Sequence, residues 1–147
     1  MSTPSRADLI NEFKKDVIEA LNPLRHSIEK LQHKPIPLIL DNEKKLDELE
    51  PWEALTSRFS RVTDIFLSKY IRLKVLDLDP GFRGEMRDLL DKAEKIGLVS
   101  SADQWMKIRE LRNKISHEYT PEDLNKTFEE VLKLTPFVLN ELKEFSS

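Results

Sequence analysis

The sequence has no cysteine, and it has only three histidines and three glycines in 147 residues. The absence of cysteine excludes disulfide bonds, thiolate metal sites and cysteine nucleophiles. Three histidines are too few for a histidine-rich metal centre. No glycine-rich loop that could hold phosphates is present, which excludes a P-loop nucleotide hydrolase. We therefore expect neither a metal nor a cofactor.

Long apolar runs are also missing. The longest purely apolar runs, such as residues 38–40, have three residues, far short of the ~20 apolar residues that a membrane-spanning helix needs. Residues 1–16 are polar and charged, without the apolar core of a secretory signal. These absences predict a cytoplasmic protein with no membrane partner. No strand-like alternation of useful length, internal repeat or low-complexity tract is present either.

Charged residues, by contrast, are abundant, at 35% of the chain. Globular proteins average ~25%, so this composition favours a small, highly helical domain. Lys plus Arg number 24 and Asp plus Glu number 27, for a net charge of −3. This balance argues against a protein that is basic all over and coats nucleic acid, but it leaves room for a local basic patch.

Apolar residues recur at spacings of three and four, which is the pattern of amphipathic helices. We expect a kink or break at Pro23, a helix start at Pro51, a helix end at Gly97 and a kink at Pro136. The predicted helices cover about residues 10–31, 51–78, 84–96, 101–117 and 121–142, and residues 41–50 form a short helix or an ordered loop. The chain is therefore expected to be an all-α, up-and-down bundle of four or five helices. Residues 1–147 form one domain, with 1–50 as an N-terminal helical extension and connection and 51–147 as the core.

The fourth predicted helix carries an arginine on its apolar side. On a helical wheel, Trp105, Ile108, Leu111 and Ile115 define the buried side, and Arg112 lies among them. Because burial of an unpaired charge is costly, Arg112 must have a partner or an anionic ligand.

Polar residues surround this arginine near the end of the helix. Arg109, Asn113 and Ser116 lie beside it. His117 follows on the same helix face as Asn113, at the point where the helix must end before residues 120–121 begin the next helix. Tyr119 comes two residues later. The stretch thus combines a fixed cation, an amide, an imidazole and a phenol.

Residues 112–119, Arg-Asn-Lys-Ile-Ser-His-Glu-Tyr, resemble the signature of HEPN domains. In that family an arginine is followed by a polar residue, usually asparagine, and then by a histidine at a spacing of four to six; four residues intervene here. HepT-like members of the family also carry a tyrosine two residues after the histidine, and Tyr119 resembles them in this position. The resemblance covers about residues 51–142.

This resemblance implies a function and partners. HEPN domains are usually dimers whose arginines and histidines line one cleft, and many are metal-independent endoribonucleases. HepT-like members are toxins, and a minimal nucleotidyltransferase antitoxin silences them by transferring AMP onto the motif tyrosine. The implied roles are phosphate clamp for Arg112, acid and base for His117, orientation for Asn113 and modification for Tyr119. The implied partners are RNA, a second copy of the chain and the antitoxin.

Further substrate contacts are predicted beside the motif and on the second helix. Arg109 and Ser116 flank the motif arginine on its own helix. Arg58 and Arg61 lie one turn apart in a stretch with surplus positive charge, which is suited to following an RNA backbone. A solvated helix face is the alternative for such a basic stretch.

Several alternatives remain open. Arg112 could pair with an acidic residue of another helix, His117 could only complement the helix dipole, and Tyr119 could be a packing residue. The chain could then be a non-catalytic HEPN-fold subunit that binds a nucleotidyltransferase or a nucleotide, which the negative net charge favours. It could also be a helical interaction protein with a chance motif. A nucleotidyltransferase encoded in the neighbouring reading frame would support the first two functions against the third.

Overall fold

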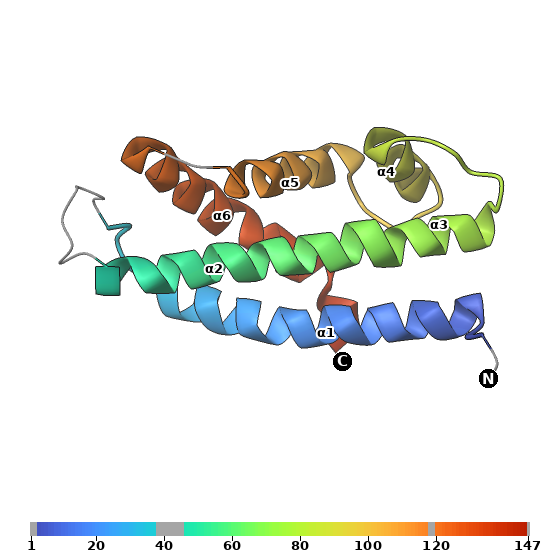
Figure 1. Cartoon of the computed structure of the whole chain (residues 1–147), viewed down its shortest axis with the longest axis horizontal. Helices are drawn as coiled ribbons and strands as arrows, with labels where there is room; N and C mark the ends of the chain where they lie inside the picture. The colour runs from blue at the N-terminus through green and yellow to red at the C-terminus, as the bar shows by residue number, and fades with distance from the viewer. Residues whose placement is uncertain (1–2, 38–45, 118–119, 147) are drawn as a thin grey trace.

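The computed structural model describes residues 3–37, 46–117 and 120–146, and all regular elements within these ranges are helices. This confirms the all-α prediction. The order of the elements is α1 (Arg6–Leu31), α2 (Leu46–Asp64), η2 (Ile65–Ile71), α3 (Arg72–Leu78), α4 (Met86–Lys95), α5 (Ala102–Ile115), α6 (Pro121–Glu141) and η3 (Lys143–Ser146). Because α2, η2 and α3 follow one another without a gap, they form one long helix that crosses the molecule (Figure 1).

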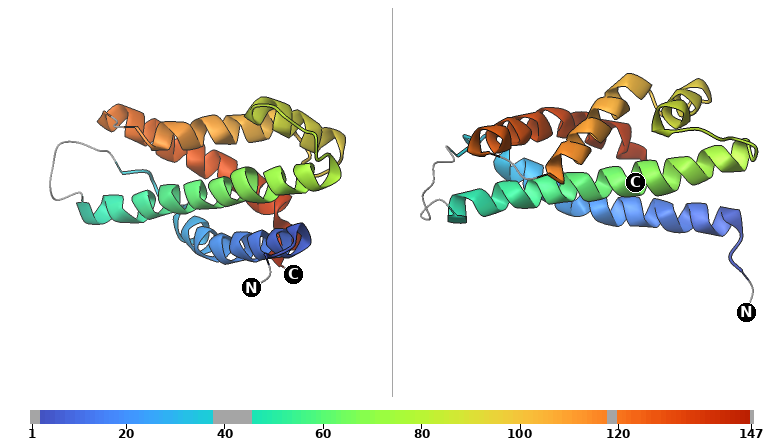
Figure 2. Two further views of the ribbon diagram at one scale, coloured as in Figure 1. Left: turned by 45° about the vertical axis from the view of Figure 1, so that its right-hand side comes forward. Right: turned by 45° about the horizontal axis from the view of Figure 1, so that its top comes forward.

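The long helix is sandwiched between two groups of helices. It has α1 along one side and α4, α5 and the first part of α6 on the other (Figures 1 and 2). Helix α6 then passes behind the long helix, so that η3 lies against α1 (Figure 1). Buried side chains from α1, the long helix, α4, α5 and α6 belong to one contiguous apolar core. The N-terminal helix therefore packs into the same core as the motif helix.

Helix α1 begins at a capping box and carries the predicted apolar stripe. The Ser5 hydroxyl accepts the N–H of Asp8, and the Asp8 carboxylate accepts the N–H of Ser5, which satisfies two otherwise unpaired donors. The helix continues through Pro23 without a break. Arg58 of α2 packs against this proline, donating to the carbonyl of Pro23 and to the hydroxyl of Ser27.

The predicted start of the second helix at Pro51 is wrong, because α2 begins at Leu46 and Pro51 lies inside it. Asp47 and Glu48 fall in the first turn, where their charges complement the positive end of the helix dipole. These acids favour a helix start at Leu46, before the proline. Residues 46–50 thus belong to α2, while the rest of the predicted 41–50 segment lies outside the described residues.

A π-helical segment, η2, interrupts the long helix directly after Asp64. Its wider i→i+5 bonding rotates the following residues relative to an α-helix. In the sequence, the apolar stripe of an α-helix runs from Leu55 through Phe66 and predicts Tyr70 and Leu73 as its next core residues. Both are only partly buried, and Ile71 and Val75 are fully buried in their place.

Helix α5 is fixed at its beginning by contacts with α6. Ser101 caps it by accepting the N–H of Gln104. The Glu141 carboxylate accepts hydrogen bonds from the backbone and hydroxyl of Ser100 and from the indole of Trp105. Gly97, with a φ of +82°, follows the C-cap of α4 and ends that helix as predicted. These contacts orient α5 so that its last turns lie over α2.

Helix α6 starts at the predicted cap. The Thr120 hydroxyl accepts the N–H of Asp123, and Pro121 occupies the first turn. The helix is continuous through Pro136. The core that it completes includes Trp105 and Phe66, whose ring centroids lie 4.7 Å apart.

Candidate functional site

Arg112 crosses from α5 to α2 and pairs with Asp64. Its Nε lies 2.5 Å from one carboxylate oxygen of Asp64, and its Nη2 lies 2.8 Å from the other. This two-point arrangement is the strongest geometry for an arginine–carboxylate pair and fixes the plane of the guanidinium. The expectation that Arg112 must have a partner is met by an acidic residue of another helix, the alternative that the sequence left open.

The pair leaves part of the guanidinium available for a ligand. Nη1 of Arg112 makes no hydrogen bond with any described residue, and the side chain is 28% exposed. The hydrogen bond to Asp64 raises the pKa of Arg112 above its usual value. The group is therefore a permanent cation, held in a defined orientation, with one edge open to an anion.

A hollow of about 340 Å³ lies beside Arg112 between α2, α5 and α6. Its apolar wall consists of Ile115, Leu124 and Phe128, and the rest is lined by hydroxyl groups and by the carboxylate of Glu53. Ser116, predicted as a substrate contact, lines the same hollow. Its volume lies at the lower end of the range for small-molecule sites, and its mixed lining is typical of them.

Asn113 and His117 lie at the carboxyl end of α5 near this hollow in sequence, but neither lines it. Both side chains are exposed. Ser116 ends the helix, and its hydroxyl donates to the carbonyl of Asn113. The N–H of His117 donates to the carbonyl of Lys114. The imidazole is thus presented to solvent just past the helix end, where the dipole favours a cation.

The other predicted substrate residues divide among three places. Arg61 lines a second hollow on α2, next to Asp64. Arg58 faces the opposite side and bonds to α1, so the two arginines do not share a surface. Arg109 is partly buried one turn before Arg112, and its Nη1 is buried without a hydrogen-bond partner. Tyr119, the predicted modification site, lies outside the described residues.

Asp64, Ser57 and Ser60 also belong to the site, although the sequence did not predict them. Asp64 is one of the few acids in a basic stretch of the second helix. This isolated carboxylate was the sequence signal that could have identified it as a partner for Arg112. Ser57 and Ser60 each line both hollows, and the Ser60 hydroxyl is buried without a hydrogen-bond partner. Only the packing of α5 and α6 onto α2 gives these serines a place in a site.

In the described part of the chain, no helix combines the length and apolarity needed to span a bilayer. None of the histidine, aspartate and glutamate side chains in this part gather in a group of three or more that could hold a metal ion.

Comparison with known proteins adds no relative: no family model matches the chain, and no curated protein or solved structure matches it. The geometry above is therefore the structural basis for any functional assignment.

Proposed function

We propose that this chain is a HEPN-family endoribonuclease of the HepT-like branch, the toxin of a toxin–antitoxin pair. The observation that carries the proposal is Arg112, a charged guanidinium held on two atoms by Asp64 and open at Nη1 beside a ligand-sized hollow. Residues 112–119, which resemble the signature of the family's ribonucleases, contain both Arg112 and His117. The family resemblance also carries the expectation that cleavage needs no metal.

The chemistry suits RNA. A neutral imidazole can take the proton from a ribose 2′-OH. The 2′-oxygen then attacks phosphorus, the bond from phosphorus to the 5′-oxygen breaks, and that oxygen accepts a proton from an acid. The products are a 2′,3′-cyclic phosphate and a 5′-hydroxyl. Arg112 stabilises the extra negative charge on the phosphate oxygens at the transition state.

The proposal includes a homodimer. Each chain brings one motif histidine, so separate groups for base and acid require His117 from both copies. Asn113 orients the imidazole or binds substrate. Mixing wild-type chains with an excess of His117→Ala chains forms dimers with a single motif histidine, and a loss of cleavage beyond simple dilution of the wild type would support a shared site.

Silencing by the antitoxin rests on Tyr119 and on the family resemblance. AMP attached to this phenol places a bulky anion close in sequence to Arg112. Such a group competes with an RNA phosphate both sterically and electrostatically. Intact-mass analysis of the chain expressed with a minimal nucleotidyltransferase is expected to show one added AMP that is absent in Tyr119→Phe.

A second function is favoured by one specific observation. Arg112 is already paired, and the net charge is −3, so the chain could act as a HEPN-fold subunit that binds a nucleotidyltransferase or a nucleotide without cleaving RNA. Binding without turnover is the expected behaviour of such a subunit.

Product analysis separates these two functions. The purified chain is incubated in EDTA with a single-stranded RNA, with the same sequence carrying 2′-O-methyl groups, and with the matching DNA. The proposed enzyme cuts only the unmodified RNA and leaves 2′,3′-cyclic phosphate ends. Cleavage of the DNA or of the methylated RNA would contradict the mechanism, and cleavage of none would favour the binding subunit.

A further inference from the structure

Two neighbouring hollows share one face of α2. The first is the hollow beside Arg112, and the second, of about 480 Å³, is lined by Arg61, Asp64, Ile65 and Lys69. Both are also lined by Ser57 and Ser60. Because these side chains are small and common to both hollows, the hollows adjoin along the helix. We call the combined depression the α2 groove.

The two halves of the α2 groove differ in chemistry. The half against α5 and α6 has the apolar wall of Ile115, Leu124 and Phe128, and the exposed side chain of Glu53 also lines it. The other half carries Arg61 and Lys69, both exposed. Asp64 is the acid of this second half, and its charge is offset by Arg112.

The cations of the second half are available to an anion. Arg61 forms no ion pair with a described residue. Lys69 lies 5.8 Å from the centre of the Phe13 ring, a contact that leaves its ammonium hydrated and charged. Between the halves, the Ser60 hydroxyl is buried and unpartnered, which is rare in a protein without a ligand or water to satisfy it.

We propose that the α2 groove binds one strand of RNA lengthwise across the Arg112–Asp64 pair. A base lies against the apolar wall, and the phosphates on the other side of Arg112 follow Arg61 and Lys69. This inference rests on the proposed function and deepens it, because it assigns a path to the substrate. Bases can reach an apolar wall only when they are unstacked, so the groove takes a single strand and not a duplex.

The phosphate half is tested by salt dependence. Binding of a 2′-O-methyl RNA oligonucleotide, which cannot be cleaved through its 2′-position, is measured by fluorescence anisotropy over a range of salt concentrations. Loss of one phosphate contact lowers the slope of log affinity against log salt by about 0.7 for a single strand. We expect this change for Arg61→Ala. The matched control is Arg83→Ala, an exposed arginine that lines neither hollow, and it keeps the wild-type slope.

The base half is tested with an abasic oligonucleotide. Leu124→Ala removes apolar surface from the wall and is expected to weaken binding of the normal strand about fivefold. Binding of a strand that lacks bases changes little in this variant, whereas Arg61→Ala weakens both strands alike. Thermal melting followed by circular dichroism checks that Leu124→Ala folds, since this side chain also contacts the core.

The junction provides a variant that does not disturb the core. Ser57 is exposed, and Ser57→Glu introduces a negative charge where both hollows meet. It is expected to weaken RNA binding at least about tenfold. Asn11→Glu adds the same charge at an exposed position of α1 and is expected to bind RNA like the wild type.

The outcomes separate this inference from the proposed function. Wild-type binding with the expected losses, but without cleavage of normal RNA, supports the groove and contradicts the enzyme. Cleavage with unchanged binding by Arg61→Ala, Leu124→Ala and Ser57→Glu overturns the groove alone. If the wild type binds no RNA, the inference is wrong. It is also wrong if Ser57→Glu changes only dimerisation and leaves RNA binding unaltered, because the groove is then a protein contact.

Discussion

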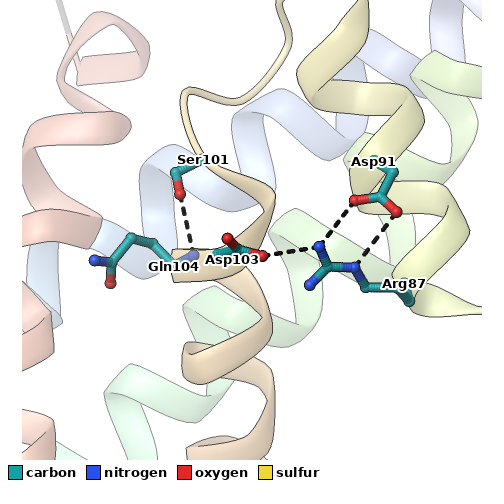
Figure 3. A network of polar contacts seen from close by, with 5 residues as sticks. All are labelled: Arg87, Asp91, Ser101, Asp103 and Gln104. Atoms are coloured by element: carbon teal, nitrogen blue, oxygen red, sulfur yellow. Dashed lines mark hydrogen bonds and ion pairs between the residues drawn. The ribbon is translucent and has the colours of Figure 1, made fainter.

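An arginine–aspartate ion pair lies near each end of α5, and the two ion pairs differ in burial and geometry. Near its beginning, Arg87 of α4 donates to Asp103 of α5 and also to Asp91 of its own helix (Figure 3). Near its end, Arg112 donates from two nitrogens to the single carboxylate of Asp64. The side chains of Arg87 and Asp103 are 51% and 78% exposed, against 28% and 45% for Arg112 and Asp64.

The difference shows which pair is suited to chemistry. An arginine shared between two exposed carboxylates competes with water and salt, and such surface pairs contribute little. A hydrogen bond raises the pKa of both arginines, from Asp103 in one case and Asp64 in the other, so charge alone does not distinguish them. The distinguishing property is a fixed guanidinium plane next to a hollow: Arg112 lines the first hollow, and Arg87 lines neither of the two hollows described above.

The largest expected effect comes from His117. His117→Ala removes the proposed acid and base, and we expect RNA cleavage to fall roughly 10²- to 10⁴-fold. The side chain is exposed, so the free energy of unfolding should stay within about 0.5 kcal/mol of the wild type. Single-turnover kinetics and urea denaturation measure the two quantities. Unchanged cleavage in the folded variant would remove His117 from the site.

A smaller effect, on stability, separates the two ends of α5. Glu141→Ala deletes the acceptor for Ser100 and Trp105 and is expected to cost about 2 kcal/mol of unfolding free energy. Glu129→Ala, at an exposed position of the same helix, serves as the control and should change stability little. Equal urea midpoints for the two variants would show that Glu141 does not hold α5 in place.

The comparison of the two ion pairs is tested most closely at their aspartates. Asp64→Asn keeps the size of the side chain but loses the charge that orients Arg112. We expect about a tenfold lower cleavage rate at saturating RNA, with a similar KM, and about 1 kcal/mol lower stability. Asp103→Asn makes the same change at Arg87 and should leave the cleavage rate unaltered. If Asp64→Glu restores the rate, Asp64 acts by positioning Arg112; equal rates for the two asparagine variants would contradict that role.

The smallest expected effect concerns pH and involves Tyr70, which packs against the aromatic rings of Phe66 and Phe145, away from both ion pairs. Burial raises the pKa of Tyr70 above its ordinary 10.0, because the charged phenolate is desolvated. The folded state therefore holds this proton more tightly than the unfolded state. The resulting stability is fully present below about pH 10 and is lost as pH rises through the folded pKa. Tyr70→Phe should flatten the fall of the melting temperature above pH 10; an identical fall in both proteins would exclude Tyr70 as its cause.

Much of the fold could be predicted because each helix carries local signals. Ser101, Gly97 and Thr120 end or begin helices where their backbone chemistry predicts. The start of α2 was placed too late because Pro51 is typical of a first turn, and the acids before it were given too little weight. The register after Asp64 was wrong because a π-helical segment depends on tertiary packing and has no clear sequence signal.

The site could be predicted only in part. The sequence indicates that Arg112 needs a partner, since its wheel position lies among apolar residues. The identity of that partner could not be predicted, because Asp64 and Arg112 are 48 residues apart and meet only when α5 packs on α2. Arg58 and Arg61 look equivalent in sequence, yet the packing of α1 turns Arg58 into a structural contact. The roles of His117 and Tyr119 remain predictions.

The most direct test of the account compares the two arginines in one assay. Single-turnover cleavage of a single-stranded RNA in EDTA is measured for the wild type, Arg112→Ala and Arg87→Ala, each with a wild-type circular dichroism spectrum. The account predicts a loss of at least about a hundredfold for Arg112→Ala and an unchanged rate for Arg87→Ala. Equal rates for the two variants would contradict the claim that the Arg112–Asp64 pair belongs to a reactive site.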